Sequence, residues 1–156
     1  MTRKSTPSNA KKGNVVKHDH YKEAFARIND AIELGFFIEA IAIEEGIISD
    51  RLTSHLSYFG KLPKSKFPTL KKLTEAWEKI AGTDIEKKLI AKIDKWRDAR
   101  NHAVHGIVKC SDETKNDSVN AFLKEAKDSA AKGLEIVNEL KKWHGAEVRK
   151  SKKCSK

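Results

Sequence analysis

Residues 36–59, FFIEAIAIEEGIISDRLTSHLSYF, form the most apolar segment of this 156-residue chain. Apolar side chains recur in it every three or four residues, which is the spacing of one face of an α-helix. Other apolar residues widen this face over most of the helix surface, and a helix of that kind packs at the centre of a bundle. The segment therefore predicts a central helix, with an apolar stripe of Phe37, Ile41, Ile48, Leu52, Leu56 and Phe59.

Helical spacing continues on both sides of this segment, and no convincing strand pattern with a period of two residues is present. Gly35 and Gly82 are expected to end two of the helices, and the prolines of 60–68 indicate a loop. The sequence therefore predicts an all-α up-down bundle of four to five helices with short connections. The expected helices begin at Asp19, at Phe36, near Thr69, at Thr83 or Asp84, and after the polar cluster 111–117, and the last ends near Trp143.

The chain carries a formal net charge of +10, and most of this charge lies near its two ends. Residues 1–18 have five basic side chains and no acidic one, whereas residues 141–156 have seven basic and one acidic. Residues 19–140 sum to −1. We therefore expect a disordered basic tail over 1–18, a helical bundle over 19–143 and a second disordered basic tail over 144–156.

Composition excludes several classes of protein. No apolar run approaches the ~20 residues of a membrane span, and residues 1–14 lack the apolar stretch of a secretory signal. Cys110 and Cys154 are too few for a disulfide framework or a zinc site of their own. No Walker or Rossmann glycine motif is present, so neither a nucleotide cofactor nor any other cofactor is expected. The sequence predicts a cytoplasmic protein that does not enter a membrane and whose positive charge favours a polyanionic partner, RNA first.

The densest polar cluster is residues 96–106, WRDARNHAVHG, on the fourth predicted helix. Arg100 follows Trp96 at the spacing of the inward face, and a buried unpaired charge is very costly. Arg100 must therefore have a partner, for which Glu44 and Glu45 are the candidates, or face a cleft. Arginine suits bidentate contact with phosphate oxygens, and His105, at the helix end, suits proton transfer.

The five-residue separation of Arg100 and His105 has a geometric consequence. It corresponds to about 140° of rotation on an ideal helix, so the two side chains do not share one face. Either the helix distorts near its end, or the pair converges only with a second copy of the chain.

These residues resemble the R-x4–6-H motif of HEPN domains, with Asn101 directly after Arg100 as is frequent in that family. The resemblance implies a small all-α homodimer, of a family in which many members are metal-independent ribonucleases of toxin–antitoxin, phage-defence and CRISPR-associated systems. It implies that His105 activates the ribose 2′-OH or protonates the leaving 5′-oxygen, that Arg100 stabilises the transition-state charge, and that Asn101 orients the site. The implied product has 2′,3′-cyclic phosphate ends, and a cognate antitoxin or other partner protein is possible.

Further side chains are candidates for the same site. Arg97, with Asp94 as its expected partner, and His102 are candidates for substrate binding, although Asp98 and His102 also have the spacing of a surface pair, and no metal site is expected. Glu44 and Glu45 are candidate acidic helpers, or the partners that hold Arg100. The lysines of the basic loop are candidates for phosphate contact: Lys61, Lys64 and Lys66.

Two other functions remain open at this point. The chain could be a non-catalytic HEPN-like scaffold module of a paired, toxin–antitoxin-like system. It could also bind nucleic acid through its basic tails alone, in which case His105 would be dispensable.

Overall fold

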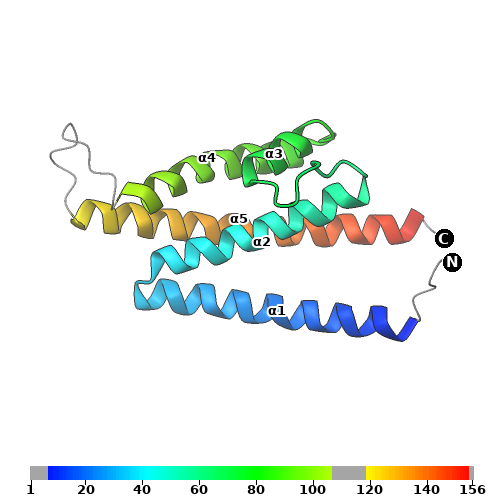
Figure 1. The fold of residues 1–156 in the computed structure, drawn as a ribbon, viewed down its shortest axis with the longest axis horizontal. Helices are drawn as coiled ribbons and strands as arrows, with labels where there is room; N and C mark the ends of the chain where they lie inside the picture. The colour runs from blue at the N-terminus through cyan, green and yellow to red at the C-terminus, as the bar shows by residue number, and fades with distance from the viewer. Residues whose placement is uncertain (1–6, 107–118, 155–156) are drawn as a thin grey trace.

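The computed structural model describes residues 7–106 and 119–154, and it contains five α-helices and no strand within these ranges (Figure 1). The predicted all-α bundle is therefore confirmed. The expected cluster 111–117 between the last two helices lies outside the described residues. The helices are α1 (Pro7–Leu34), α2 (Phe37–Tyr58), α3 (Leu70–Glu78), α4 (Asp84–Gly106) and α5 (Val119–Cys154).

The segment 36–59 forms the central helix α2, which packs against α1, α3 and α5. Helix α5 in turn packs along α4, so α5 lies beside both α2 and α4 (Figure 1). Most of the predicted stripe is fully buried, namely Ile41, Ile48, Leu52 and Leu56, whereas Phe37 is half-buried and Phe59 is exposed. Burying a side chain of this size stabilises the fold by roughly 1.5–3 kcal/mol.

Two glycines end α1 and α2 in the same way. Gly35 has a φ of +82°, and Phe36 N–H donates to the Ala31 carbonyl at 2.7 Å while Gly35 N–H donates to the Ile32 carbonyl. This pair of bonds is a Schellman motif, which favours glycine because the residue after the helix is left-handed. Gly60, with a φ of +64°, ends α2 with the same two bonds.

Helix α4 begins with a reciprocal capping box. Thr83 Oγ1 accepts a hydrogen bond from Glu86 N–H at 3.3 Å, and Glu86 Oε2 accepts from Thr83 N–H at 3.0 Å. The cap is therefore Thr83, rather than the alternative Asp84. The predicted role of Gly82 as the residue that ends α3 is wrong, because α3 already ends at Glu78 and Gly82 has no positive φ.

The described parts of both expected tails are helical rather than disordered, and residues 1–6 and 155–156 lie outside the described residues. Helix α1 begins at Pro7 rather than Asp19, and proline is favoured in the first turn of a helix. Helix α5 continues through Gly145 to Cys154 rather than ending near Trp143. Residues 7–18 and 144–154 are thus helical extensions of the bundle.

Contacts with α2 account for these extensions. On α1, Lys17 Nζ lies 2.9 Å from Asp50 Oδ2 and Tyr21 OH donates to the same carboxylate at 2.5 Å. On α5, His144 lies against Arg51, whose Nη1 donates to His144 Nδ1 at 3.3 Å. Local composition does not show these contacts, because they need the helices to be packed. None of the described helices has the length and apolarity that crossing a membrane requires.

Candidate functional site

Arg100 is held by one of its two candidate partners. Its Nη2 donates to Glu45 Oε1 at 2.5 Å, which joins α4 to α2. The side chain of Arg100 is 15% exposed and that of Glu45 is 32% exposed, so the pair lies at the rim of the core. The contact uses one of five guanidinium N–H donors, and the buried Nε has no partner among the described residues. Arg100 therefore retains donors for a further acceptor.

His105 and Asn101 lie on another side of α4 from Arg100. Helix α4 is continuous to Gly106, so no distortion brings Arg100 and His105 together within one chain. Asn101 and His105 are about 40° apart around the helix axis, and both are exposed. Neither makes a hydrogen bond or ion pair with another described residue. The chain therefore presents two separate groups of motif side chains, one toward α2 and one toward solvent.

Arg97 is engaged by carboxylates. Its Nη1 lies 2.8 Å from Asp94 Oδ1, as predicted, and its Nη2 lies 3.3 Å from Asp98 Oδ1. Thr74 on α3 donates to the same Asp94 oxygen at 2.9 Å. Asp94 therefore joins α4 to α3 through Thr74, and Arg97, neutralised by two acids of its own helix, is not a free anion-binding group.

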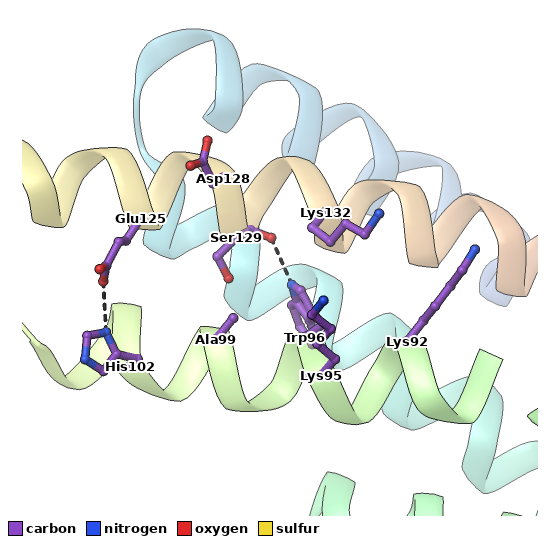
Figure 2. A pocket seen from close by; sticks show the side chains of 9 residues that line it. All are labelled: Lys92, Lys95, Trp96, Ala99, His102, Glu125, Asp128, Ser129 and Lys132. Carbon is purple, nitrogen blue, oxygen red and sulfur yellow. Dashed lines mark hydrogen bonds and ion pairs between the residues drawn. The ribbon is translucent and has the colours of Figure 1, made fainter. Parts of the chain in front are cut away.

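His102 pairs with α5 rather than with its neighbour on α4. Its Nδ1 lies 2.9 Å from Glu125 Oε2, so the predicted surface pair with Asp98 is wrong (Figure 2). His102 lies on the side of α4 that faces α5, so its imidazole reaches Glu125 on that helix. Within the described residues, no group of three or more candidate ligands could hold a metal ion.

A groove between α4 and α5 begins at the His102–Glu125 pair and has a volume of about 550 Å³ (Figure 2). Ala99, in its wall, is about 160° from Asn101 around α4, so the groove opens away from the exposed motif residues. The sequence did not predict this groove, because it depends on how α4 and α5 pair across the chain. Its lining is Lys92, Lys95, Trp96, Ala99, His102, Glu125, Asp128, Ser129 and Lys132.

Glu44 lies in the core rather than beside Arg100. Its side chain is fully buried, and neither carboxylate oxygen has a hydrogen-bond partner in the described part of the chain. The Glu44 carboxylate lies against Gly133 of α5, in the space that a Cβ at position 133 would occupy, and the Trp96 indole is close by. Burial raises the pKa of Glu44 to about 8, so the group is mostly protonated at neutral pH. Glu45, not Glu44, is the acid next to Arg100.

The basic loop lies far from the motif. Lys61, Lys64 and Lys66 are all exposed in the connection between α2 and α3. Tyr58, which precedes this connection, is 13 residues along α2 from Glu45, or about 20 Å by the helical rise. The lysines therefore follow the end of α2, whereas the end of α4, which carries Arg100 and His105, lies toward the opposite end of the bundle (Figure 1).

Comparison with known proteins returned nothing: no family model, no curated protein and no solved structure matches this chain. The resemblance to HEPN domains stays a prediction, which depends on the spacing of Arg100 and His105 and on their place late in a long helix.

Proposed function

We propose that this protein is a HEPN-like RNA-binding protein that cleaves RNA without a metal ion, as a homodimer with a composite site. The observation that carries the proposal is the arrangement at the end of α4. Arg100 has unused N–H donors at the rim of the core, and His105 and Asn101 are exposed on another side of α4. A guanidinium and an imidazole are the groups that phosphodiester cleavage by the ribose 2′-OH requires.

The rotation between Arg100 and His105 is the reason for a dimer. Within one straight helix the two side chains point about 140° apart, so one phosphate cannot contact both in a single chain. A second copy related by a two-fold axis would place its own motif across the gap and supply a second proton-transfer group. This oligomeric state is part of the proposal.

The proposed reaction is an internal transesterification. His105 accepts the proton of the 2′-OH, the 2′-oxygen bonds to phosphorus, and the bond to the 5′-oxygen breaks. The leaving oxygen takes a proton from the second imidazole, and the product carries a 2′,3′-cyclic phosphate. Arg100 stabilises the charge that builds on the phosphoryl oxygens, and Asn101 orients the phosphate.

The test is incubation of the purified chain with single-stranded RNA in EDTA. Wild type is compared with His105→Ala and Arg100→Ala, and His20→Ala, an exposed histidine on α1, is the matched control. We expect cleavage by wild type and by the control, with cyclic phosphate ends, and none by the two motif variants. A folded dimeric wild type that leaves RNA intact, or a His105→Ala variant that still cleaves, would contradict the proposal.

One observation favours a second candidate, a non-catalytic scaffold module of a paired system. The Glu45 carboxylate neutralises Arg100, and a neutralised arginine can serve structure alone. A scaffold module should bind a protein encoded next to it equally well as wild type and as His105→Ala. Neither form should cleave RNA. Loss of that binding in the variant would count against it.

A further inference from the structure

Segments that are far apart in the sequence lie toward the same end of the bundle. The start of α1, the end of α2 and the last turns of α5 all lie there (Figure 1). Residues 1–18 and 61–72 each contain five basic side chains and no acidic one, and residues 141–156 contain seven basic and one acidic. Packing therefore brings the end of α2, which leads into the basic segment 61–72, beside residues 144–151 of α5.

Exposed aromatic rings lie among these charges. Tyr58 is 74% exposed, Phe59 52% and Phe67 80%, although large aromatic side chains are normally buried. The rings of Tyr58 and Phe59 contact each other edge to face at 5.1 Å, and Lys66 Nζ lies 5.6 Å from the Phe67 ring. Exposed rings beside lysines are the surface on which unpaired nucleobases stack while the phosphates meet the cations.

A hollow of about 420 Å³ opens next to Tyr58 and Phe59, between the ends of α2 and α5. His55 and His144 lie in its lining, as do Glu147 and Lys150, whose side chains form an ion pair at 2.8 Å. Burial lowers the pKa of both imidazoles, so they are neutral near pH 7. Arg51 has only donors, so His144 Nδ1 accepts its hydrogen bond and Nε2 carries the ring proton. His144 can therefore donate from Nε2 to the edge of a base, because its acceptor nitrogen is already used.

A second hollow of about 370 Å³ adjoins the same loop. Lys61, Lys72 and Lys79 lie around it, with Glu75 as the one acid in its lining. Residues 58–67 connect the two hollows along the chain and carry three exposed aromatic rings and three exposed lysines. We name this surface the terminal patch: Tyr58, Phe59, Lys61, Lys64, Lys66, Phe67, Lys72, Lys79, His144 and Lys150.

We propose that the terminal patch binds single-stranded RNA, with a base in the hollow between α2 and α5 and phosphates on the lysines. The inference takes RNA as the substrate class from the proposed function and adds a second binding surface for it. The patch lies about 20 Å along α2 from the Glu45–Arg100 pair, so it holds a part of the strand that is not being cleaved. An anionic membrane fits less well, because lipid tails cannot use the polar edges of His55 and His144.

The test measures binding of an unstructured, fluorescently labelled oligoribonucleotide by anisotropy in EDTA, in a His105→Ala background that prevents cleavage. Stacking of one base on an aromatic ring contributes about 1–3 kcal/mol, so Tyr58→Ala is expected to weaken binding about 5- to 150-fold. Lys64→Glu with Lys66→Glu is expected to weaken binding and to lower the slope of log Kd against log salt by about 0.7 for each phosphate that the variant no longer neutralises. Lys22→Glu with Lys127→Glu reverses two exposed charges outside the patch and is expected to change affinity little.

Two results would overturn the inference. One is wild-type affinity in both patch variants, or an equal loss in the control pair. The other is patch-dependent binding to phosphatidylserine vesicles without binding to RNA, which would assign the surface to a membrane. This inference and the proposed cleavage can fail separately. If the protein binds RNA through the patch but does not cleave it, the patch inference holds and the catalytic proposal is wrong.

Discussion

Glu44 and Glu45 are neighbours in the chain but lie in different environments. Glu44 is fully buried against Gly133, whereas Glu45 is at the rim and binds Arg100. The sequence predicted that one of the two would partner Arg100, but not which one. Helix α2 is apolar over most of its surface, so its pattern does not fix its rotation about its own axis. That rotation depends on the packing of α5 and α4.

The buried carboxyl of Glu44 predicts a pH dependence of stability. Its pKa is about 8 in the folded state and near its ordinary value of 4.5 when unfolded. The folded state therefore binds more protons between these values, and the free energy of unfolding falls as pH rises from about 5 to 8. Each pKa unit corresponds to about 1.4 kcal/mol, so the loss should reach a few kcal/mol. Urea unfolding of wild type and Glu44→Gln at pH 5, 7 and 9 checks this, and an equal pH response in both would contradict it.

The Arg100–Glu45 pair predicts separate effects on stability and on RNA binding. Arg100 is mostly buried and loses its charged partner, so Glu45→Gln should cost about 1–3 kcal/mol of unfolding free energy. It leaves the Arg100 charge uncompensated, so affinity for RNA should increase and become more dependent on salt. Thermal unfolding and RNA titrations at two salt concentrations measure both effects. Unchanged RNA affinity would indicate that Arg100 does not contact phosphate.

At the scale of the helices, most elements could be predicted and the pairing of their side chains could not. The boundaries at Gly35 and Thr83 follow from local chemistry, because caps and turns depend on neighbouring residues. The extension of α5 beyond Trp143 and the pairing of His102 with Glu125 depend on other helices. Sequence periodicity contains no such information.

Gly133 in α5 gives a prediction at this scale. A Cβ at position 133 would overlap the Glu44 carboxylate, and overpacking of a core costs about 1–3 kcal/mol. Gly133→Ala should therefore lower the melting temperature. Gly145 lies in the same helix and has open space where a Cβ would be added, so Gly145→Ala is the control and should stabilise by about 0.5–1 kcal/mol. Equal effects of the two substitutions would contradict the tight fit at Gly133.

The fold places the basic segments and the Arg100–His105 motif in different parts of the molecule, although the sequence suggested one RNA-binding role for both. The exposed aromatic rings Tyr58 and Phe59 lie at the end of α2, whereas the end of α4, which carries Arg100, Asn101 and His105, lies toward the opposite end of the bundle (Figure 1). The net charge of +10 indicated a polyanionic partner, but only the fold shows where the basic segments lie relative to one another. Oligomeric state, on which the composite site depends, is not encoded in any local pattern of this chain.

If two chains together form the active site, cleavage requires the dimer. Because one chain holds Arg100 and His105 on different sides of α4, activity per chain should rise with protein concentration in parallel with the dimer fraction. Sedimentation and cleavage rates measured over the same dilution series check this. Constant activity per chain in samples that are fully monomeric would contradict the composite site.

The central claim is that Arg100 and His105 cleave RNA without a metal ion. The most direct measurement is the chemical form of the RNA ends after incubation with wild type or His105→Ala in EDTA. The account predicts 2′,3′-cyclic phosphate ends with wild type and intact RNA with His105→Ala. Intact RNA with a folded, dimeric wild type, or the same ends from both proteins, would contradict it.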